Sequence, residues 1–106
     1  SGTTYTIPDS VIMIGGSAFY DCDSLTSVTI PDSVTRIGTE AFFECSSLAT
    51  VYCKPTTPPT GGLGMFYNNA SGRKIYVPAS DDDIIINVYK TTSYWNDYKG
   101  SIFEEE

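Results

Sequence analysis

Hydrophobic and polar residues recur along this chain at a fixed spacing. Residues 6–28 (TIPDSVIMIGGSAFYDCDSLTSV) and 29–51 (TIPDSVTRIGTEAFFECSSLATV) are identical at 14 of 23 aligned positions, which defines a 23-residue period. The period continues in the prolines, which stand at Pro8, Pro31, Pro55 and Pro78, and in Phe19, Phe42 and Phe66, each at the same offset from a proline. A unit this short cannot bury its own apolar side, so the pattern predicts an array in which each coil packs on the next. Residues 52–78 are interpreted as a degenerate third coil with one inserted residue.

Each unit contains one predicted strand and one return segment. LTSVTIP (25–31) alternates polar and apolar residues, as in a half-buried β-strand, and its proline ends the strand because it has no N–H to donate. The following pattern V-x-x-I-G-x-x-A-F-x-x-C spaces apolar residues by three and four, which predicts a tight 3₁₀ or helical return. Strands one period apart are expected to be parallel neighbours, about 4.8 Å apart.

Stacking turns equivalent positions into columns across the predicted sheet. The two inward columns are Tyr5, Val28, Val51, Ile75 and Ile7, Ile30, Cys53, Val77, and the phenylalanines form a third on the return side. The two outward columns are Thr4, Ser27, Thr50, Lys74 and Thr6, Thr29, Tyr52, Tyr76. Burial of a large apolar side chain contributes roughly 1.5–3 kcal/mol, so at least three stacked coils are needed to offset the lost chain entropy.

The consensus C-x-x-L-x-x-V-x-I-P-x-x-V-x-x-I-x-x-x-A-F, from Cys22 to Phe42, resembles the BspA-like leucine-rich repeats of bacterial surface proteins. The resemblance covers about residues 5–103, and 74–103 is similar to the closing segment of such arrays. It implies an α/β fold: a right-handed leucine-rich-repeat solenoid with a short parallel β-sheet, 3₁₀ or helical returns and a C-terminal helical cap. Members are typically exported, and several are implicated in adhesion to host proteins, so the resemblance implies an extracellular or cell-surface location.

Three segments are predicted along the chain. Residues 1–2 are interpreted as the remnant of a processed or engineered start, 3–78 as leucine-rich-repeat coils (two regular 23-residue units and one degenerate), and 79–106 as a C-terminal cap with an acidic tail. In the cap, residues at helical spacing predict a helix: Ile84, Ile85, Val88, Tyr89 and Thr92. Ser80 or an aspartate of 81–83 is expected to cap the first amides of this helix. Calcium binding by these aspartates is the alternative, but the D-x-D-x-D-G frame is missing.

Aromatic residues in the cap have two interpretations. Trp95, Tyr94 and Tyr98 are expected to seal the end of the last coil, as a terminal repeat requires. A platform on which a ligand stacks is the alternative.

Composition excludes several kinds of function. Hydrophobic residues make up 41% and charged residues 18%, so a folded chain is expected. The net charge is -7 and no basic cluster is present, so no phosphate-binding face is expected and nucleic acid is not a predicted partner. No apolar run approaches the roughly 20 residues of a membrane-spanning helix, so no membrane insertion is predicted. The absence of histidine removes the commonest metal ligand and general base.

The three cysteines are expected to be free thiols. Cys22 and Cys45 occupy the same repeat position on adjacent coils, close enough for a disulfide but with side chains that point in parallel. Cys53 lies at an inward strand position, where cysteine serves as a small apolar residue. No C-x-x-C pair exists for zinc, and neither a metal nor a cofactor is predicted.

No catalytic residue is predicted. Asp9 with Asp32, and Glu40 with Glu44, are the nearest candidates for an acid and base pair, but both pairs lie on turns or on the exposed return side. No nucleophile elbow, phosphate loop or dinucleotide motif is present.

The outward side of the sheet is the candidate binding site. Its residues change from small and polar in the first coils to aromatic and basic further along: Ser27, Thr29, Thr50, Tyr52, Lys54, Lys74 and Tyr76. Tyr52 above Tyr76 is a suitable anchor for a partner, because tyrosine combines rigid contact area with a polar tip. The alternative is that threonine and tyrosine simply suit an exposed sheet.

The sequence therefore predicts a non-enzymatic interaction or adhesion module of an exported bacterial leucine-rich-repeat protein, with a host or extracellular-matrix protein or another surface macromolecule as partner. A structural stalk or array-terminating cap is one alternative, and a small carboxylate-dependent hydrolase is another. The first strand has an unpaired edge, which indicates either a longer parent array or self-association through the N-terminal edge.

Overall fold

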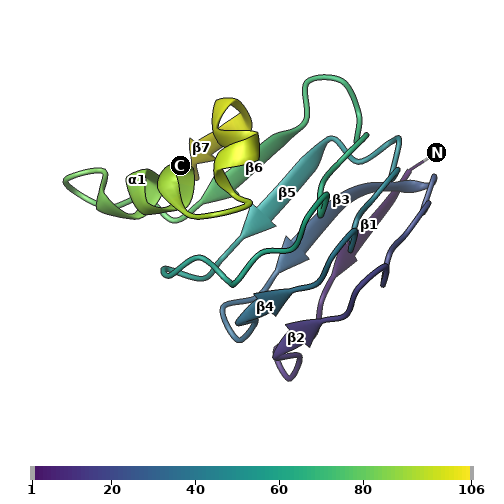
Figure 1. Ribbon diagram of the computed structural model, residues 1–106, viewed down its shortest axis with the longest axis horizontal. Coiled ribbons are helices and arrows are strands. Elements are labelled where there is room, and N and C mark those ends of the chain that lie inside the picture. Colours follow the sequence, from purple (N-terminus) through teal and green to yellow (C-terminus); the bar gives the residue numbers. More distant parts are fainter. Residues whose placement is uncertain (1, 106) are drawn as a thin grey trace.

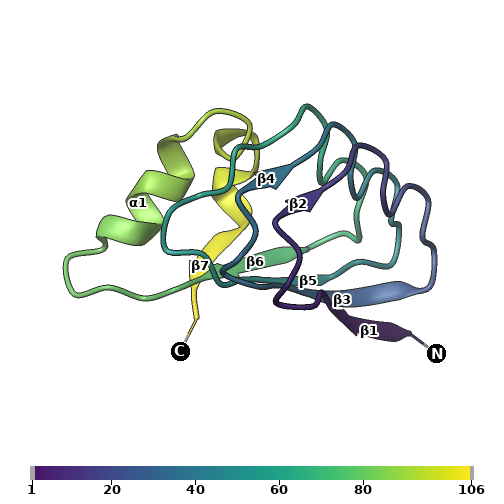
Figure 2. The ribbon, with the colours of Figure 1, turned by 90° about the horizontal axis from the view of Figure 1, so that it is seen from below.

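A five-stranded parallel sheet forms one side of the molecule, and each of its first four strands begins a new coil of the chain (Figures 1 and 2). The computed structural model describes residues 2–105, so Ser1 of the predicted remnant and Glu106 of the predicted tail lie outside the described residues. In spatial order the strands are β1 (Thr3–Thr6), β3 (Leu25–Ile30), β5 (Thr50–Cys53), β6 (Lys74–Val77) and β7 (Ile102–Glu104). Coil 1 begins at β1, coil 2 at β3, coil 3 at β5 and coil 4 at β6.

The register of the sheet confirms the predicted columns. Val28 pairs with Val51 and Thr29 with Tyr52 between β3 and β5, and Tyr52 pairs with Tyr76 between β5 and β6. The inward residues of coils 2 to 4 are all 0% exposed: Val28, Ile30, Val51, Cys53, Ile75 and Val77. Tyr5 holds the same column in coil 1 but is 42% exposed, because within residues 2–105 only β3 flanks its strand.

The phenylalanine column also forms as predicted. The ring centroids of Phe19 and Phe42 are 4.9 Å apart, and those of Phe42 and Phe66 are 5.4 Å apart, with nearly parallel planes. This column joins the inward strand residues to form one continuous core between the sheet and the returns.

The predicted 3₁₀ or helical returns are wrong. Two short strands, β2 (Met13–Ile14) and β4 (Arg36–Ile37), pair in parallel on the return side, and successive turns follow them (Figure 2). Each return contains two residues with positive φ, which end any helical run; in coil 1 these are Ser17 (58°) and Asp21 (58°).

Hydrogen bonding between coils explains why turns replace a helix. The amides of Ser17, Phe19 and Asp21 donate to carbonyl oxygens of the next coil at 2.7–3.0 Å. The amides of Ala18 and Tyr20, which alternate with them, donate within their own turns. A continuous helix would use every amide internally and leave the neighbouring coil's carbonyls without donors.

Two helical segments follow β6: α1 (Ile84–Thr91) and the 3₁₀ helix η1 (Asn96–Ser101). The Ile85 amide donates to Ser80 Oγ at 3.1 Å, which confirms one of the two predicted capping groups, whereas Asp83 makes no side-chain cap. The chain then enters β7, where Ile102 pairs with Ile75. Glu104 of the predicted acidic tail is therefore part of a strand, which the sequence analysis did not anticipate.

Buried aromatic side chains fill the space between α1, η1 and coil 3. Trp95 and Tyr89 are both 0% exposed, and their rings meet edge to face with centroids 4.9 Å apart. Trp95 also lies 5.9 Å from the ring of Phe66. The interpretation of Trp95 as part of a ligand-stacking platform is therefore wrong, because no face of its ring is accessible.

All three cysteines are free thiols, as predicted. Cys45 Sγ donates to the carbonyl oxygen of Phe19 at 2.9 Å, and Asn69, one coil further on, donates to the carbonyl oxygen of Phe42 at 2.9 Å. Burial raises the pKa of the Cys45 thiol to about 11 and that of the Cys53 thiol to about 12. These thiols serve packing and coil-to-coil hydrogen bonding.

Candidate functional site

The predicted binding residues lie together on the outward side of the sheet, which we call the outer face. Ser27, Thr50 and Lys74 form one row across three strands, and Thr29, Tyr52 and Tyr76 form the adjacent row. All are half-buried except Lys74, which is exposed. Since neighbouring strands fix their backbones, these side chains form a continuous surface.

Three aromatic rings line the C-terminal half of this face, and we call them the outer aromatic ladder: Tyr52, Tyr76 and Phe103. The Tyr52 and Tyr76 rings stack with centroids 5.6 Å apart and planes 20° apart. Phe103 of β7 extends the row at 6.3 Å from Tyr76 and is 41% exposed. Phe103 was not among the predicted site residues, because Ile102 and Phe103 are adjacent apolar residues and lack the alternation that marks a half-buried strand.

The two lysines of the candidate site differ in their surroundings. Lys54 Nζ lies 2.9 Å from both carboxylate oxygens of Glu105 and 5.8 Å from the centroid of the Tyr52 ring. Its charge is therefore compensated within the chain. Lys74 Nζ lies 6.0 Å from the Phe103 ring and has no acidic partner among residues 2–105, so it contributes the free positive charge of this face.

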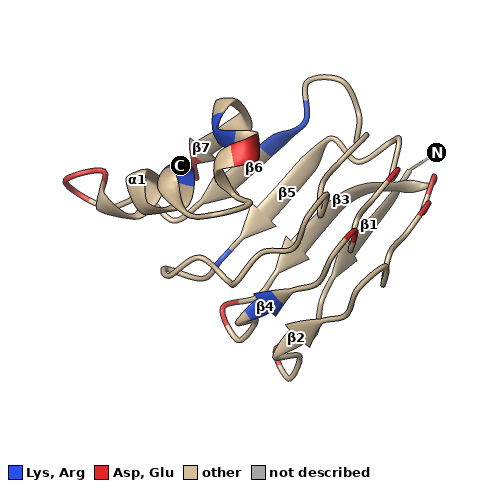
Figure 3. Ribbon diagram, in the orientation of Figure 1, with Lys and Arg blue, Asp and Glu red and all other residues tan. Residues whose placement is uncertain are grey.

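The charge distribution sets the outer aromatic ladder apart from the first coils. Five of the six basic residues follow residue 53, whereas the first two coils carry six acidic residues and a single arginine (Figure 3). The β1 and β3 part of the outer face is made of threonine and serine. A partner of the ladder therefore meets aromatic rings and a lysine, with hydroxyl groups along one flank.

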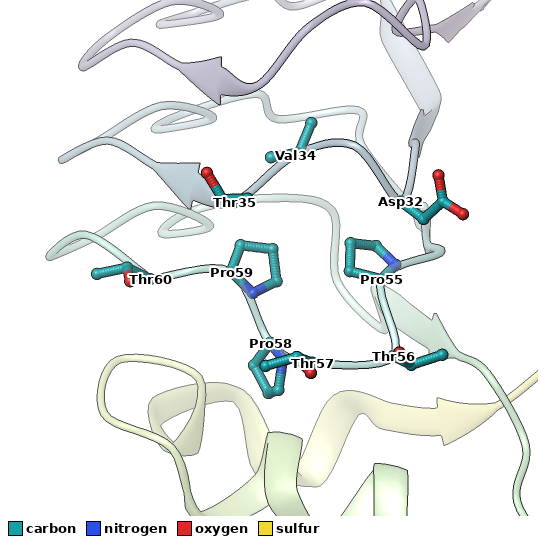
Figure 4. A pocket seen from close by; sticks show the side chains of 9 residues that line it. All are labelled: Asp32, Val34, Thr35, Pro55, Thr56, Thr57, Pro58, Pro59 and Thr60. Carbon is teal, nitrogen blue, oxygen red and sulfur yellow. The ribbon is translucent and has the colours of Figure 1, made fainter.

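A surface pocket of about 490 Å³ opens beside the outer face, between residues 32–35 of coil 2 and 55–60 of coil 3 (Figure 4). Its lining consists of Asp32, Val34, Thr35, Pro55, Thr56, Thr57, Pro58, Pro59 and Thr60. A second hollow of about 570 Å³ shares Asp32 and Thr56 with it and extends to Thr29 and Lys54 of the outer face. Sequence analysis treated 52–78 only as a degenerate coil and missed this pocket.

The loop that forms one wall of the pocket is held by hydrogen bonds from buried aromatic residues. Tyr89 Oη donates to the carbonyl oxygen of Pro55 at 2.6 Å, and Trp95 Nε1 donates to that of Pro59 at 2.7 Å. Burial raises the pKa of Tyr89 far above its usual range, so this hydroxyl keeps its proton. The amide of Thr60 donates to the carbonyl oxygen of Thr35 at 2.9 Å.

Of the other sequence candidates, two aspartates border the hollow beside the outer face, and the remaining ones lie elsewhere. Asp9 and Asp32 border the same open hollow, and Glu40 and Glu44 are turn residues with φ of 57° and 58°. Asp81–Asp83 are exposed in the loop before α1. Within residues 2–105, no three His, Cys, Asp or Glu side chains are placed to hold a metal ion, and no helix is long and apolar enough to cross a membrane.

Acidic side chains also gather on the return side. Asp21, Asp23 and Glu44 line a shallow hollow with Asn68, and a hydrogen bond and charge repulsion from Asp23 raise the pKa of Asp21. Beside it, the exposed rings of Tyr20 and Tyr67 stack on the half-buried ring of Phe43 at 5.3 and 5.4 Å. This second aromatic row resembles the outer aromatic ladder in geometry and differs from it in charge.

Comparison with protein-family models matches residues 1–96 to a model described as "BspA type Leucine rich repeat region (6 copies)". No curated protein matches the chain. The matched range includes the repeated coils and α1 and ends where η1 begins, so β7 and Phe103 lie beyond it.

Proposed function

The chain belongs to the BspA-type leucine-rich repeat family, and on this basis we propose that it is a non-enzymatic protein-interaction module that binds its partner through the outer face. The partner is a host or extracellular-matrix protein, or another surface macromolecule, and the parent protein is exported and acts in adhesion. Neither nucleic acid nor a membrane is its target. Repeat proteins of this kind use their extended surfaces for binding rather than for bond chemistry.

The outer aromatic ladder carries the proposal. Its rings are held by the sheet backbone and by one another, so little side-chain entropy is lost when a partner covers them. Tyr52 and Tyr76 offer hydroxyl groups at the edge of an apolar surface, a combination enriched at binding hot spots. Lys74 adds one uncompensated charge that can pair with an acidic group of the partner.

We propose that the coils form a right-handed solenoid, with α1 and η1 as its C-terminal cap. Parallel strands joined by crossovers are right-handed in nearly all proteins. The buried Trp95 and Tyr89 support the role of a cap, since Trp95 packs on Phe66 of coil 3 and Tyr89 packs on Trp95. In this arrangement the cap supports the strands that carry the outer aromatic ladder.

Self-association through the N-terminal edge is a second proposal. The apolar side chains of coil 1 are more exposed than their equivalents: Phe19 is only partly buried, whereas Phe42 and Phe66 are 0% exposed. A hollow of about 170 Å³ lined by Tyr5, Ile7, Phe19 and other uncharged residues lies at this end. A second copy or a further coil of the parent array would cover it.

Two other functions compete with binding by the outer face. A stalk or array terminator would use the same coils without a partner, and the sealed C-terminal end is consistent with that role. A carboxylate-dependent hydrolase would require Asp9 and Asp32 to act on a bound substrate, and no sequence motif for such chemistry accompanies them.

The test is a double substitution, Tyr52→Ala with Tyr76→Ala, in binding assays against immobilised matrix proteins and host-cell surfaces. We expect binding to fall by tenfold or more, because two adjacent hot-spot side chains are removed. The matched control is Tyr20→Ala with Tyr67→Ala, which removes two exposed tyrosines that stack on Phe43 from the return side. Equal binding by the wild type and the Tyr52/Tyr76 variant would contradict the proposal, and no binding to any surface would favour the stalk.

A further inference from the structure

The pocket between coil 2 and the Pro55–Thr60 loop has a mixed lining, in which three prolines and Val34 alternate with four threonines. Val34, Pro55 and Pro59 are buried residues that border it, and Figure 4 shows the two proline rings on different sides of the hollow. Asp32 stands at the rim, with its carboxylate directed outward. It is the only charged residue in the lining.

The lining offers several hydrogen-bond acceptors and no cationic donor, and its threonine hydroxyls can both donate and accept. The three prolines have no N–H to offer. Between coils 1 and 2, Ser33 Oγ donates to the carbonyl oxygen of Val11 at 2.7 Å, but among residues 2–105 no group donates to the equivalent carbonyl oxygen of Val34. The Asp32 carboxylate likewise has no hydrogen-bond or ion-pair partner in the described chain. A ligand that donates hydrogen bonds and carries positive charge would complement this lining.

The pocket is also formed before any ligand arrives. Tyr89 and Trp95 hold the carbonyl groups of Pro55 and Pro59 from behind, and three prolines restrict the loop's backbone. A wall that is fixed in advance loses little entropy on binding. The contact of Thr60 with Thr35 closes the far end of the loop onto coil 2.

We propose that this pocket binds a lysine or arginine side chain of the protein partner. The aliphatic stem packs against the rings of Pro55 and Pro59, and the charged head donates hydrogen bonds to the Asp32 carboxylate at the rim. The inference deepens the proposed function, on which it rests for the nature of the partner. The hollow that links Asp32 to Thr29 and Lys54 allows one partner to occupy the pocket and the outer face together.

Two other ligand classes fit the lining less well. An anion would meet the negative charge of Asp32 without any basic residue in the lining. A sugar would find no aromatic ring in the lining on which to stack. Both nevertheless serve as competing outcomes in the test.

The test uses the whole chain, labelled with ¹⁵N, and titrations followed by amide chemical shifts. The probes are acetyl-Gly-Lys-Gly-amide and the same peptide with norleucine, which keeps the stem and lacks the charge. We expect the lysine peptide to shift the amides of Thr35, Thr56, Thr57 and Thr60 in a saturable manner. The norleucine peptide is expected to bind at least fivefold more weakly, because it cannot form a charge-assisted hydrogen bond.

The decisive variant is Asp32→Asn, with Asp9→Asn as its matched control at the same repeat position of coil 1. Asp32→Asn is expected to weaken lysine-peptide binding about tenfold, and Asp9→Asn to change it less than twofold. Both aspartates are exposed, so an unchanged melting temperature is expected. Equal binding of both peptides, no effect of Asp32→Asn, or equal shifts with methyl glucoside or inorganic phosphate would each overturn the proposal.

The test of the pocket can fail independently of the test of partner binding by the outer face. The Tyr52→Ala, Tyr76→Ala variant is expected to bind the lysine peptide like the wild type, because neither tyrosine lines the pocket. Loss of partner binding in that variant with intact peptide binding supports both proposals. Absence of peptide binding in the wild type overturns the pocket assignment alone.

Discussion

The two ends of the coil stack contain equivalent residues in different environments. At the C-terminal end, β7, α1 and η1 follow coil 3, and Phe66, Tyr89 and Trp95 are 0% exposed. At the N-terminal end, Tyr5 is 42% exposed, whereas Val28, its partner in the same column, is 0% exposed. The same repeat column is therefore core or surface according to whether another coil packs on it. The neighbouring coil decides the burial of the Tyr5 and Phe19 columns, whereas Ile7 and Ile14 of coil 1 are only 3% exposed without one on their N-terminal side within residues 2–105.

Substitutions in the phenylalanine column are expected to show the largest difference between the ends. Phe66→Ala removes a ring that contacts Phe42, Trp95 and Tyr98, and we expect the free energy of unfolding to fall by about 3–5 kcal/mol. Phe19→Ala removes the equivalent ring from the partly open coil 1, and a loss of less than about half that size is expected. Urea denaturation of both variants measures the difference. Equal losses would contradict the comparison.

Glycines at the return corner give the second largest difference. A Cβ at Gly38 would overlap the amide nitrogen of Gly16, and one at Gly62 would overlap that of Thr39. A Cβ at the equivalent Gly15 would meet nothing within 4 Å. We expect Gly38→Ala to destabilise the chain by about 1–3 kcal/mol, because backbone must shift.

Gly15→Ala is the matched control for this effect. It has no positive φ, so alanine fits its backbone, and we expect stability to stay unchanged or rise by up to about 1 kcal/mol. Thermal unfolding of the two variants under the same conditions provides the measurement. A comparable loss at Gly15 would show that the N-terminal end is covered in solution, by self-association for example.

Alkaline pH tests the buried coils in the middle of the stack. The thiols of Cys45 and Cys53 have pKa values raised by burial from 9.0 to about 11 and about 12. Because the unfolded thiols ionise first, their contribution to stability is complete below pH 9 and falls as pH rises toward the folded values. Each thiol is expected to remove about 1.4 kcal/mol per pH unit in that range. Urea denaturation midpoints from pH 8 to 10.5 measure how steeply the free energy of unfolding falls with pH. The same slope in the Cys53→Ala variant would contradict the raised pKa of the Cys53 thiol.

The ion pair at the C-terminal edge of the sheet is expected to give the smallest effect. Lys54 and Glu105 are partly exposed, with side-chain exposures of 41% and 31%. Glu105→Gln is therefore expected to lower stability by less than about 1 kcal/mol, and less still in high salt. A larger loss in thermal unfolding would mean that β7 depends on this pair for its position on β6.

The contrast between the ends also shows what the sequence could predict. Register, inward columns and the stacking of Tyr52 on Tyr76 followed from the 23-residue period, because equivalent positions of stacked coils must be neighbours. The period says nothing about β7, since Ile102 stands farther from Ile75 than one repeat and two helical segments lie between them. Phe103 was missed for that reason.

The returns and the pocket depend on interactions that the apolar spacing does not report. Alternate amides of Ser17, Phe19 and Asp21 bond to the next coil, and only the backbone geometry reveals this pattern. At the pocket, Thr57 and Pro58 of coil 3 stand where coil 2 has Ser33 and Val34, and within residues 2–105 Thr57 does not repeat the hydrogen bond of Ser33 to the preceding coil. Its fixed shape depends on Tyr89 and Trp95, which follow the loop by more than one full repeat.

Stacking of the coils in register is the central claim, and contacts between aromatic rings in solution test it most directly. An aromatic NOESY spectrum of the labelled chain is predicted to show cross-peaks from the Phe42 ring to the rings of both Phe19 and Phe66, whose centroids lie 4.9 and 5.4 Å away. The Tyr52 and Tyr76 rings, 5.6 Å apart, are predicted to show the same contact on the outer face. Absence of these cross-peaks in the folded protein would contradict the register and the binding surface built on it.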